Sequence, residues 1–346
     1  MAMNKLCRQV SIESPGPIVR ECVFSFSIPV PETPPGGVRV KVACAGACYM
    51  SRRSISSSSD DHQSPAHPGV RDSALFAGFE VSGVVDDVSE SAEGAPSVGE
   101  RVCIFPFENC PRGYAEYVGV PDPKYLMPIP ANISLAVAAM LPSGALRALN
   151  TIRMAQQHAA APRKLLVVGT GGLALWTVRI AKCLEPQMDI TVACLRDEGF
   201  QLAQSISNVT VVQWSEDLYE THLIERTIDA CCGQVDVVID YGTTSRSLHR
   251  SLQCLAEGGL VLLSDEVAER LIPKFAAKSR ERNQRIEAVG AGTVEQLREI
   301  VDLVASGRLQ PPPHTVFPID EAAEVVARLS ASDIPGRAIL RFLDID

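Results

Sequence analysis

Short segments in which apolar and polar residues alternate dominate the first 150 residues. Such alternation is typical of strands with one buried face. Gly- and Pro-containing turns separate the segments, so this half of the chain predicts a small β-barrel or sandwich. The clearest segments are Gly37 to Ala43, Glu80 to Val85 and Arg101 to Phe105.

After Pro130 the hydrophobic pattern changes to strands that alternate with helices. A helix is expected from Leu135 to Leu149, interrupted near Pro142–Gly144. Strand–helix alternation predicts a doubly wound parallel sheet, an α/β fold. The expected strands are 164–168, 190–194, 209–212, 235–240 and 259–263. A helical run follows the glycine-rich turn 169–174 and continues to Leu184, and a second helix begins over 198–205.

The C-terminal segment predicts two helices, 294–306 and 320–329, and a last strand at 337–342. Pro311 to Pro313 separate the two helices. Within the N-terminal half, Arg52 to Asp72 is rich in Ser, Asp and His, which predicts an exposed loop. His62 and His67 of that loop are expected to be solvated.

Composition narrows the class of protein. The chain has 346 residues, enough for two domains, and a net charge of −9, which opposes binding of nucleic acid or an anionic membrane. It has no long apolar run, so a cytoplasmic protein acting on a small molecule is expected. None of its 11 cysteines forms a CxxC pair, so a structural four-thiolate zinc site is not expected.

A glycine-rich turn joins the apolar strand at 164–168 to the following helix. Gly169 permits the tight turn and Gly171 allows a pyrophosphate to approach the backbone, while Ala174 takes the place of a third glycine. Gly172 and Leu173 would begin the helix whose N-terminus binds the phosphates. The alternative is a glycine turn in an α/β protein that binds nothing.

The end of the second strand favours NADP over NAD. An acidic residue is expected there for the ribose of NAD, but Cys194 and Leu195 occupy the position and Arg196 follows. A missing acid and a nearby arginine favour a 2′-phosphate; the alternative is that Arg196 is an ordinary solvated residue. Gly242, after the strand at 235–240, is a further cofactor-binding candidate.

Several motifs together resemble the medium-chain dehydrogenase/reductase superfamily over nearly the whole chain. They are Ala45-Gly46-Ala47-Cys48, Gly78-Phe79-Glu80, Gly113-Tyr114-Ala115-Glu116-Tyr117, Glu257-Gly258-Gly259-Leu260-Val261 and Gly336-Arg337-Ala338-Ile339-Leu340. The resemblance implies a GroES-like catalytic domain at 1–148, completed by 291–346, and a Rossmann domain at 149–290. It also implies a cofactor-pyrophosphate contact for Arg337 and a homo-oligomer, most simply a dimer.

The chain departs from the zinc-containing members of this superfamily. Cys48 matches the first zinc ligand, but Phe79 stands at the histidine position and Ser143 at the third ligand. A catalytic zinc needs three protein ligands. Met50 replaces the hydroxyl residue of the proton relay. The chain therefore looks more like the zinc-lacking quinone and enoyl reductases.

Hydride transfer to an enone or a quinone needs no metal, because the substrate carbonyl takes up the charge. The hypothesis is that the nicotinamide lies near Ser143 and Cys48, and that Tyr49 donates a proton. Alternatively, Tyr49 only lines an apolar pocket and Cys48 is a core thiol. Glu80 is expected to form a hydrogen bond or ion pair, or to orient a water.

Two other functions stay open. One is interconversion of alcohols and aldehydes at a non-standard site. The other is a catalytically inactive protein that retains the dinucleotide fold.

Overall fold

The computed structural model describes residues 5–12, 23–47, 49–51, 74–76, 80–107, 114–158, 163–194, 197–206, 208–214, 219–242, 244–331 and 333–343. These form two compact units. One comprises the described residues up to Ser143 with Leu297–Ala305 and those from His314 onward, and the other comprises Gly144–Gln296 with Ser306–Pro313. The sequence places the domain limits at 148/149 and 290/291.

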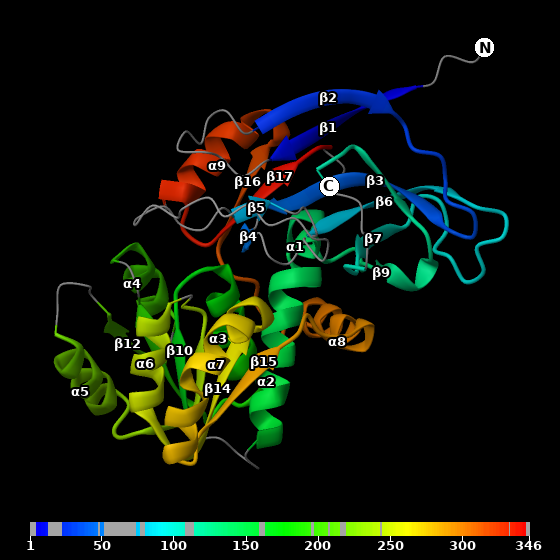
Figure 1. The fold of residues 1–346 in the computed structure, drawn as a ribbon. Coiled ribbons are helices and arrows are strands. Elements are labelled where there is room, and N and C mark those ends of the chain that lie inside the picture. Colours follow the sequence, from blue (N-terminus) through cyan, green and yellow to red (C-terminus); the bar gives the residue numbers. More distant parts are fainter. Residues whose placement is uncertain are drawn as a thin grey trace. The chain divides into compact units, whose positions relative to one another are not determined.

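The first unit is built on a seven-stranded sheet in the order β16-β17-β3-β6-β7-β9, with β8 also paired to β3 (Figure 1). The alternating valines Val38, Val40 and Val42 of β3 are fully buried, as expected for a half-buried strand. Its strands are β3 Val38–Ala47, β6 Val81–Val88, β7 Arg101–Ile104, β8 Tyr117–Val120, β9 Leu126–Pro128, β16 His314–Pro318 and β17 Arg337–Arg341.

The C-terminal segment belongs to this same sheet. β17 pairs antiparallel with β3, so that Ala338 lies opposite Ala47. The helix α9 (Ala322–Ala331) packs on these strands through Val325 and Val326. Two small sheets and short helical segments complete the unit: β1 Leu6–Ile12 with β2 Val23–Pro29, β4 Tyr49–Ser51 with β5 Ala74–Phe76, η3 Pro123–Tyr125, α1 Leu135–Ala139 and η5 Ile319–Glu321.

The second unit contains a six-stranded parallel sheet in the order β12-β11-β10-β13-β14-β15. This is the strand order of the dinucleotide-binding doubly wound fold, so the predicted α/β class is confirmed. The strands are β10 Lys164–Val168, β11 Asp189–Cys194, β12 Val209–Gln213, β13 Val235–Asp240, β14 Leu255–Ser264 and β15 Arg285–Val289.

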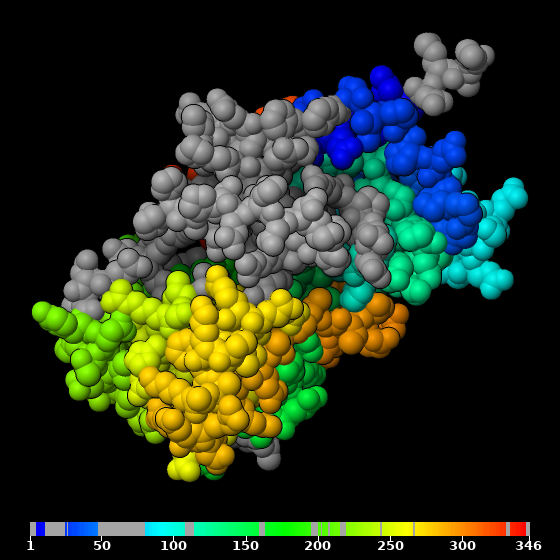
Figure 2. All heavy atoms as spheres, viewed as in Figure 1, coloured from blue at the N-terminus to red at the C-terminus, as the bar shows by residue number. Residues whose placement is uncertain are grey.

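Helices connect these strands by crossovers. The helix α7 (Asp265–Glu281), gold in Figures 1 and 2, has one side exposed and packs its other side on the sheet core through Ala268 and Leu271. The remaining helical segments of the chain are η4 Leu141–Ala145, α2 Leu146–His158, α3 Gly172–Leu184, α4 Asp197–Gln204, α5 Glu220–Ala230, α6 Ser245–Cys254 and α8 Val294–Ala305. The residues of α8 from Leu297 onward belong to the first unit. Within the described residues, no helix is both long and apolar enough to span a membrane.

Candidate functional site

The glycine turn after β10 has the backbone geometry that the sequence predicts. Gly169 has φ +115°, a conformation that L side chains rarely adopt, and its N–H donates to the Ala193 carbonyl at 2.8 Å. Gly171 has ordinary backbone angles, and a Cβ placed there would meet no atom within 4 Å. The turn is therefore fixed by Gly169 and open to solvent at Gly171.

The helix α3 begins directly at this turn with an uncapped N-terminus. Gly171 is its N-cap and contributes no capping side chain, and the first turn contains no acidic residue. Gly172 and Leu173 are partly exposed there, whereas Ala174 is buried against the sheet. Unpaired N–H groups at a helix N-terminus bind phosphate well. The open approach at Gly171 and this free helix end fit the pyrophosphate of a dinucleotide.

Tyr241 supports the glycine turn from the neighbouring strand β13. The Tyr241 N–H donates to the Val168 carbonyl at 3.0 Å. A Cβ placed on Gly169 would lie 3.4 Å from the Cβ of Tyr241. The Tyr241 hydroxyl lies 2.6 Å from the Thr177 hydroxyl on α3. Tyr241 therefore links the turn, the helix and the strand end. Sequence reasoning missed this residue, although its place after an apolar strand was a signal.

A buried carboxylate, Asp240, closes the same end of β13. It accepts hydrogen bonds from the Gly242 N–H at 2.7 Å and from the hydroxyls of Ser247 and Ser251 at 2.7 and 2.8 Å. Burial raises the pKa of Asp240 to about 6, although these three donors act in the opposite direction. A side chain at Gly242 would collide with Ser247 and Asp240. Gly242 is thus required by packing around Asp240.

The C-terminal end of β11 carries no acid. Cys194 is fully buried there, and burial raises the pKa of its thiol to about 12. Its carbonyl accepts the Trp214 N–H at 2.7 Å, which joins β11 to the end of β12. A neutral thiol cannot accept hydrogen bonds from the ribose hydroxyls as a carboxylate does. Arg196, the residue expected to pair with a 2′-phosphate, lies outside the described residues.

In the first unit, a buried ion pair lies beside the end of β3. The Glu80 carboxylate, 1% exposed, pairs with the guanidinium of Arg337 on β17. The Glu80 carbonyl accepts the Gly46 N–H at 2.8 Å, and the Tyr114 hydroxyl donates to the Gly46 carbonyl at 2.9 Å. An ion pair is one of the roles that the sequence allows for Glu80. The expected contact of Arg337 with a pyrophosphate stays a prediction.

The predicted catalytic residues are only partly described. Ser143 lies, partly exposed, in the π-helical turn η4, at the helix interruption that the sequence predicts. The backbone of Tyr49 pairs with Phe76, but its side chain lies outside the described residues. Cys48, Phe79 and the whole loop 52–72, with His62 and His67, also lie outside them. The proposed grouping of Tyr49, Cys48 and Ser143 stays a prediction.

Metal-ligating side chains do not gather in the part of the chain that the structure describes. There, no three His, Cys, Asp or Glu residues are placed to hold a metal ion. The donor set at the predicted zinc position is therefore judged on its chemistry. Phe79 has no donor atom, and the carboxylate of the next residue, Glu80, is already engaged by Arg337.

Two family models match the chain. The alcohol dehydrogenase GroES-like domain matches residues 34–131, and the zinc-binding dehydrogenase model matches residues 217–340. The two matches together cover most of the sheet of the first unit and much of the second unit.

Similar proteins match over most of their length at low identity. An NAD-dependent alcohol dehydrogenase of Sulfolobus acidocaldarius is 23% identical, with 90% of this chain and 94% of the relative covered. NADP-dependent alcohol dehydrogenase C 1 of Mycolicibacterium smegmatis is also 23% identical, with 88% and 90% covered. The solved structure of acetophenone reductase from Geotrichum candidum, in complex with NAD, covers both chains fully at a TM-score of 0.71 and 18% identity.

Proposed function

The chain belongs to the medium-chain dehydrogenase/reductase superfamily, and from this premise we propose that it is an NADP(H)-dependent reductase of quinones and enones that works without catalytic zinc. Its two domain matches are those of oxidoreductases of the alcohol dehydrogenase type. The main support for dinucleotide binding is the turn between β10 and α3. Gly171 is open to solvent there and the N-terminus of α3 has neither a side-chain cap nor an acid.

The preference for NADP rests on the end of β11. The buried, neutral Cys194 offers no carboxylate to the adenosine ribose, and Arg196 is the nearby cation that would pair with a 2′-phosphate. Relatives of both specificities exist, one named NAD-dependent and one NADP-dependent. The specificity is therefore assigned from this chain's own residues.

The absence of zinc chemistry rests on the donor set. Phe79 cannot ligate a metal, and Ser143 stands where a third ligand would be. The Glu80 carboxylate is held by Arg337. No step of the reaction is therefore assigned to a metal.

When bound, the reduced nicotinamide supplies the hydride. The residues of the chain would orient the substrate and supply the proton. Tyr49 is the proposed proton donor, with Cys48 and Ser143 beside the substrate. General acid catalysis of this kind contributes about 10²- to 10⁴-fold. Tyr49→Phe should therefore lower kcat with an enone about 100-fold and leave the Kd of NADPH unchanged.

The test begins with purified, metal-analysed protein titrated with NADPH and NADH, followed by nicotinamide fluorescence and by turnover with enones and quinones. We expect tighter binding of NADPH, substoichiometric zinc and NADPH oxidation by at least one substrate. In Arg196→Ala the NADPH preference should fall at least tenfold, while Arg163→Ala, a charge change at the opposite end of the sheet, should not alter it. Stoichiometric zinc, or tighter NADH binding, would contradict the proposal.

A second candidate function is suggested by the relatives, which are named alcohol dehydrogenases. In that case the protein would oxidise primary or secondary alcohols with NADP⁺ and show no reduction of enones. A protein that binds NADPH but turns over neither class of substrate would be a catalytically inactive dinucleotide-binding protein.

A further inference from the structure

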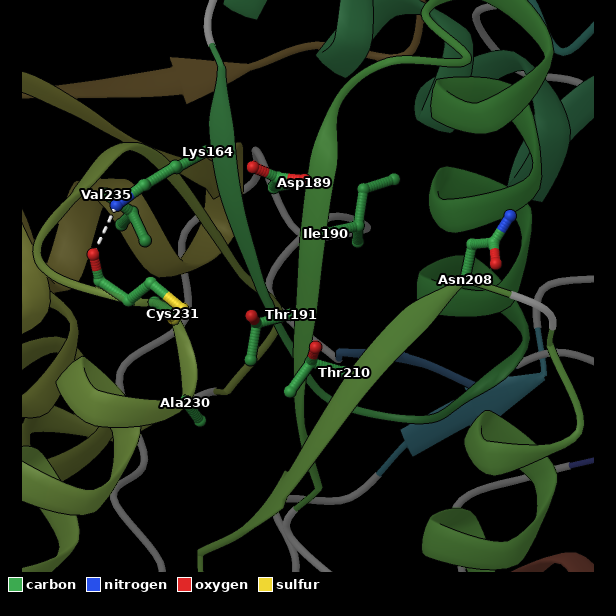
Figure 3. A pocket seen from close by; sticks show the side chains of 10 residues that line it. Lys164, Asp189, Ile190, Thr191, Asn208, Thr210, Ala230, Cys231 and Val235 are labelled. Carbon is green, nitrogen blue, oxygen red and sulfur yellow. Dashed lines mark hydrogen bonds between the residues drawn. The ribbon is translucent and has the colours of Figure 1, made fainter.

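A cavity of about 190 Å³ opens at the amino-terminal edge of the six-stranded sheet (Figure 3). Residues at the beginnings of four strands and the end of α5 line it, whereas the glycine turn follows the carboxyl end of β10. The cavity and the proposed dinucleotide site therefore lie at opposite ends of the same strand. The lining residues used below are Lys164, Asp189, Thr191, Thr210 and Cys231.

The floor of this cavity is closed and uncharged. Thr191, Cys231 and Val235 are 5%, 8% and 1% exposed. The Thr191 hydroxyl and the Cys231 thiol form a hydrogen bond, and burial raises the pKa of that thiol, which stays neutral. Charge is confined to the rim, where Lys164 is half-buried and Asp189 is exposed.

The two rim charges are neighbours that do not pair. Lys164 and Asp189 are Cα partners in the parallel strands β10 and β11, so their side chains project on the same face. Instead of forming an ion pair, the Lys164 ammonium donates a hydrogen bond to the Cys232 carbonyl at 2.5 Å, drawn as a dashed line in Figure 3. Within the described residues, the Asp189 carboxylate forms no hydrogen bond or ion pair.

The turn after α5 holds the ammonium in this position. Cys232 and Gly233 both have positive φ, +52° and +117°, which is a common way to end a helix. A Cβ at Gly233 would lie 3.4 Å from the Lys164 Nζ. Gly233 is therefore required by its backbone angle, and the ammonium lies in van der Waals contact with the turn. An ammonium has three donors, so two N–H groups of Lys164 stay available to a ligand.

We propose that this cavity binds a small zwitterion, a molecule with one carboxylate and one ammonium group such as an α-amino acid. The ligand carboxylate would accept hydrogen bonds from the Lys164 ammonium and from the Thr210 hydroxyl. Its ammonium would pair with the Asp189 carboxylate.

Charge and size both select this class of ligand. A simple anion would be repelled by Asp189, and a simple cation by Lys164, whereas a zwitterion satisfies both. The cavity is large enough for several water molecules, which leaves room for a molecule of the size of alanine or serine. The inference is independent of the dinucleotide proposal because the two sites share no residue.

The experiment is saturation-transfer NMR on the full chain with L-alanine, acetate, methylammonium and glycerol as separate probes. We expect saturable binding of L-alanine only. Lys164→Met and Asp189→Asn should each weaken it at least about tenfold, as loss of a charged hydrogen bond does, and Lys164→Arg should retain most of it. Glu225→Gln, a charge change on the exposed face of α5, is the matched control and should bind as the parent does.

A thermal melt of each variant establishes that it folds. The proposal would be overturned if L-alanine showed no saturable binding. It would also be overturned if Lys164→Met and Asp189→Asn bound L-alanine as tightly as the parent protein does. Equal binding of glycerol would show a polyol site instead, and equal binding of acetate or methylammonium would show a simple ion site. Repeating the titration with Gly171→Ala separates the two proposals, because a protein that has lost NADPH should still bind L-alanine.

Discussion

Single glycines in the turn after β10 carry separate requirements, one for folding and one for the ligand. Gly169 needs its positive φ of +115°, whereas Gly171 has ordinary angles and open space in front of it. Gly169→Ala should lower the free energy of unfolding by about 1 to 2 kcal/mol through backbone strain. Gly171→Ala should change the free energy of unfolding by less than about 0.5 kcal/mol. It should still weaken the binding of NADPH, because its methyl group would occupy the space through which the phosphate approaches the backbone.

Urea unfolding and fluorescence titration measure the two effects. If Gly171→Ala binds NADPH as tightly as the parent protein does, the phosphate does not approach at that residue. The proposed cofactor site would then be wrong, whatever the stability of Gly169→Ala.

Asp240 makes stability depend on pH in the direction opposite to that of an ordinary ion-paired aspartate. Its pKa is raised to about 6 in the fold, from 3.8 when solvated. Below pH 3.8 the carboxyl is protonated in both states and costs nothing. As the pH rises from 3.8 to 6, Asp240 ionises in the unfolded chain before it ionises in the native state. The free energy of unfolding therefore falls by up to about 3 kcal/mol, and this loss is constant above pH 6.

Asp240→Asn removes this titration and keeps the hydrogen bonds. An amide oxygen can still accept from Gly242 and Ser247, and its NH₂ can donate to the Ser251 hydroxyl. The unfolding free energy of the variant minus that of the parent should rise between pH 4 and 6 and then level off, as measured by urea unfolding. A difference that is constant over this range would contradict the raised pKa.

At the scale of elements, α7 contains a proline in its interior. Pro273 is exposed, so no packing explains it, and it cannot donate the backbone hydrogen bond that this position of a helix makes. Pro273→Ala should raise the free energy of unfolding by about 1 to 3 kcal/mol. Lys274→Ala, at the next exposed position, is the control and should change it by less than about 0.5 kcal/mol. An unchanged stability in Pro273→Ala would mean that α7 relaxes around the proline at no cost.

The strands that the sequence predicts best are those buried on both faces. Residues 164–168 and 235–240 are observed as β10 and β13 with the expected limits, because a fully buried parallel strand is a continuous apolar run. The strand expected at 259–263 extends to Leu255–Ser264. The helices α5 to α7 and the edge strand β15 are not predicted. The three helices do have an apolar stripe opposite a polar face, the pattern of a surface helix, so the sequence contained a signal for them.

At the scale of the whole molecule, a net charge of −9 opposes nucleic acid and anionic surfaces, and the chain is proposed to act on small molecules. Homo-oligomerisation is a proposal at this scale. Light scattering after size exclusion should give twice the chain mass of 37.2 kDa. A mass equal to that of one chain at micromolar concentration would contradict the dimer.

The sequence by itself determines the fold class and the glycine turn at which we propose that the dinucleotide binds, because both depend on local patterns. Apolar runs of strand length and a glycine turn before a helix act over a few neighbouring residues. The tertiary structure alone decides which distant polar groups meet. Ser247 and Ser251 reach Asp240, Arg337 pairs with Glu80 across the sheet, and Lys164 turns away from Asp189 toward Cys232. These contacts depend on strand order and register, which bring together residues far apart in the chain.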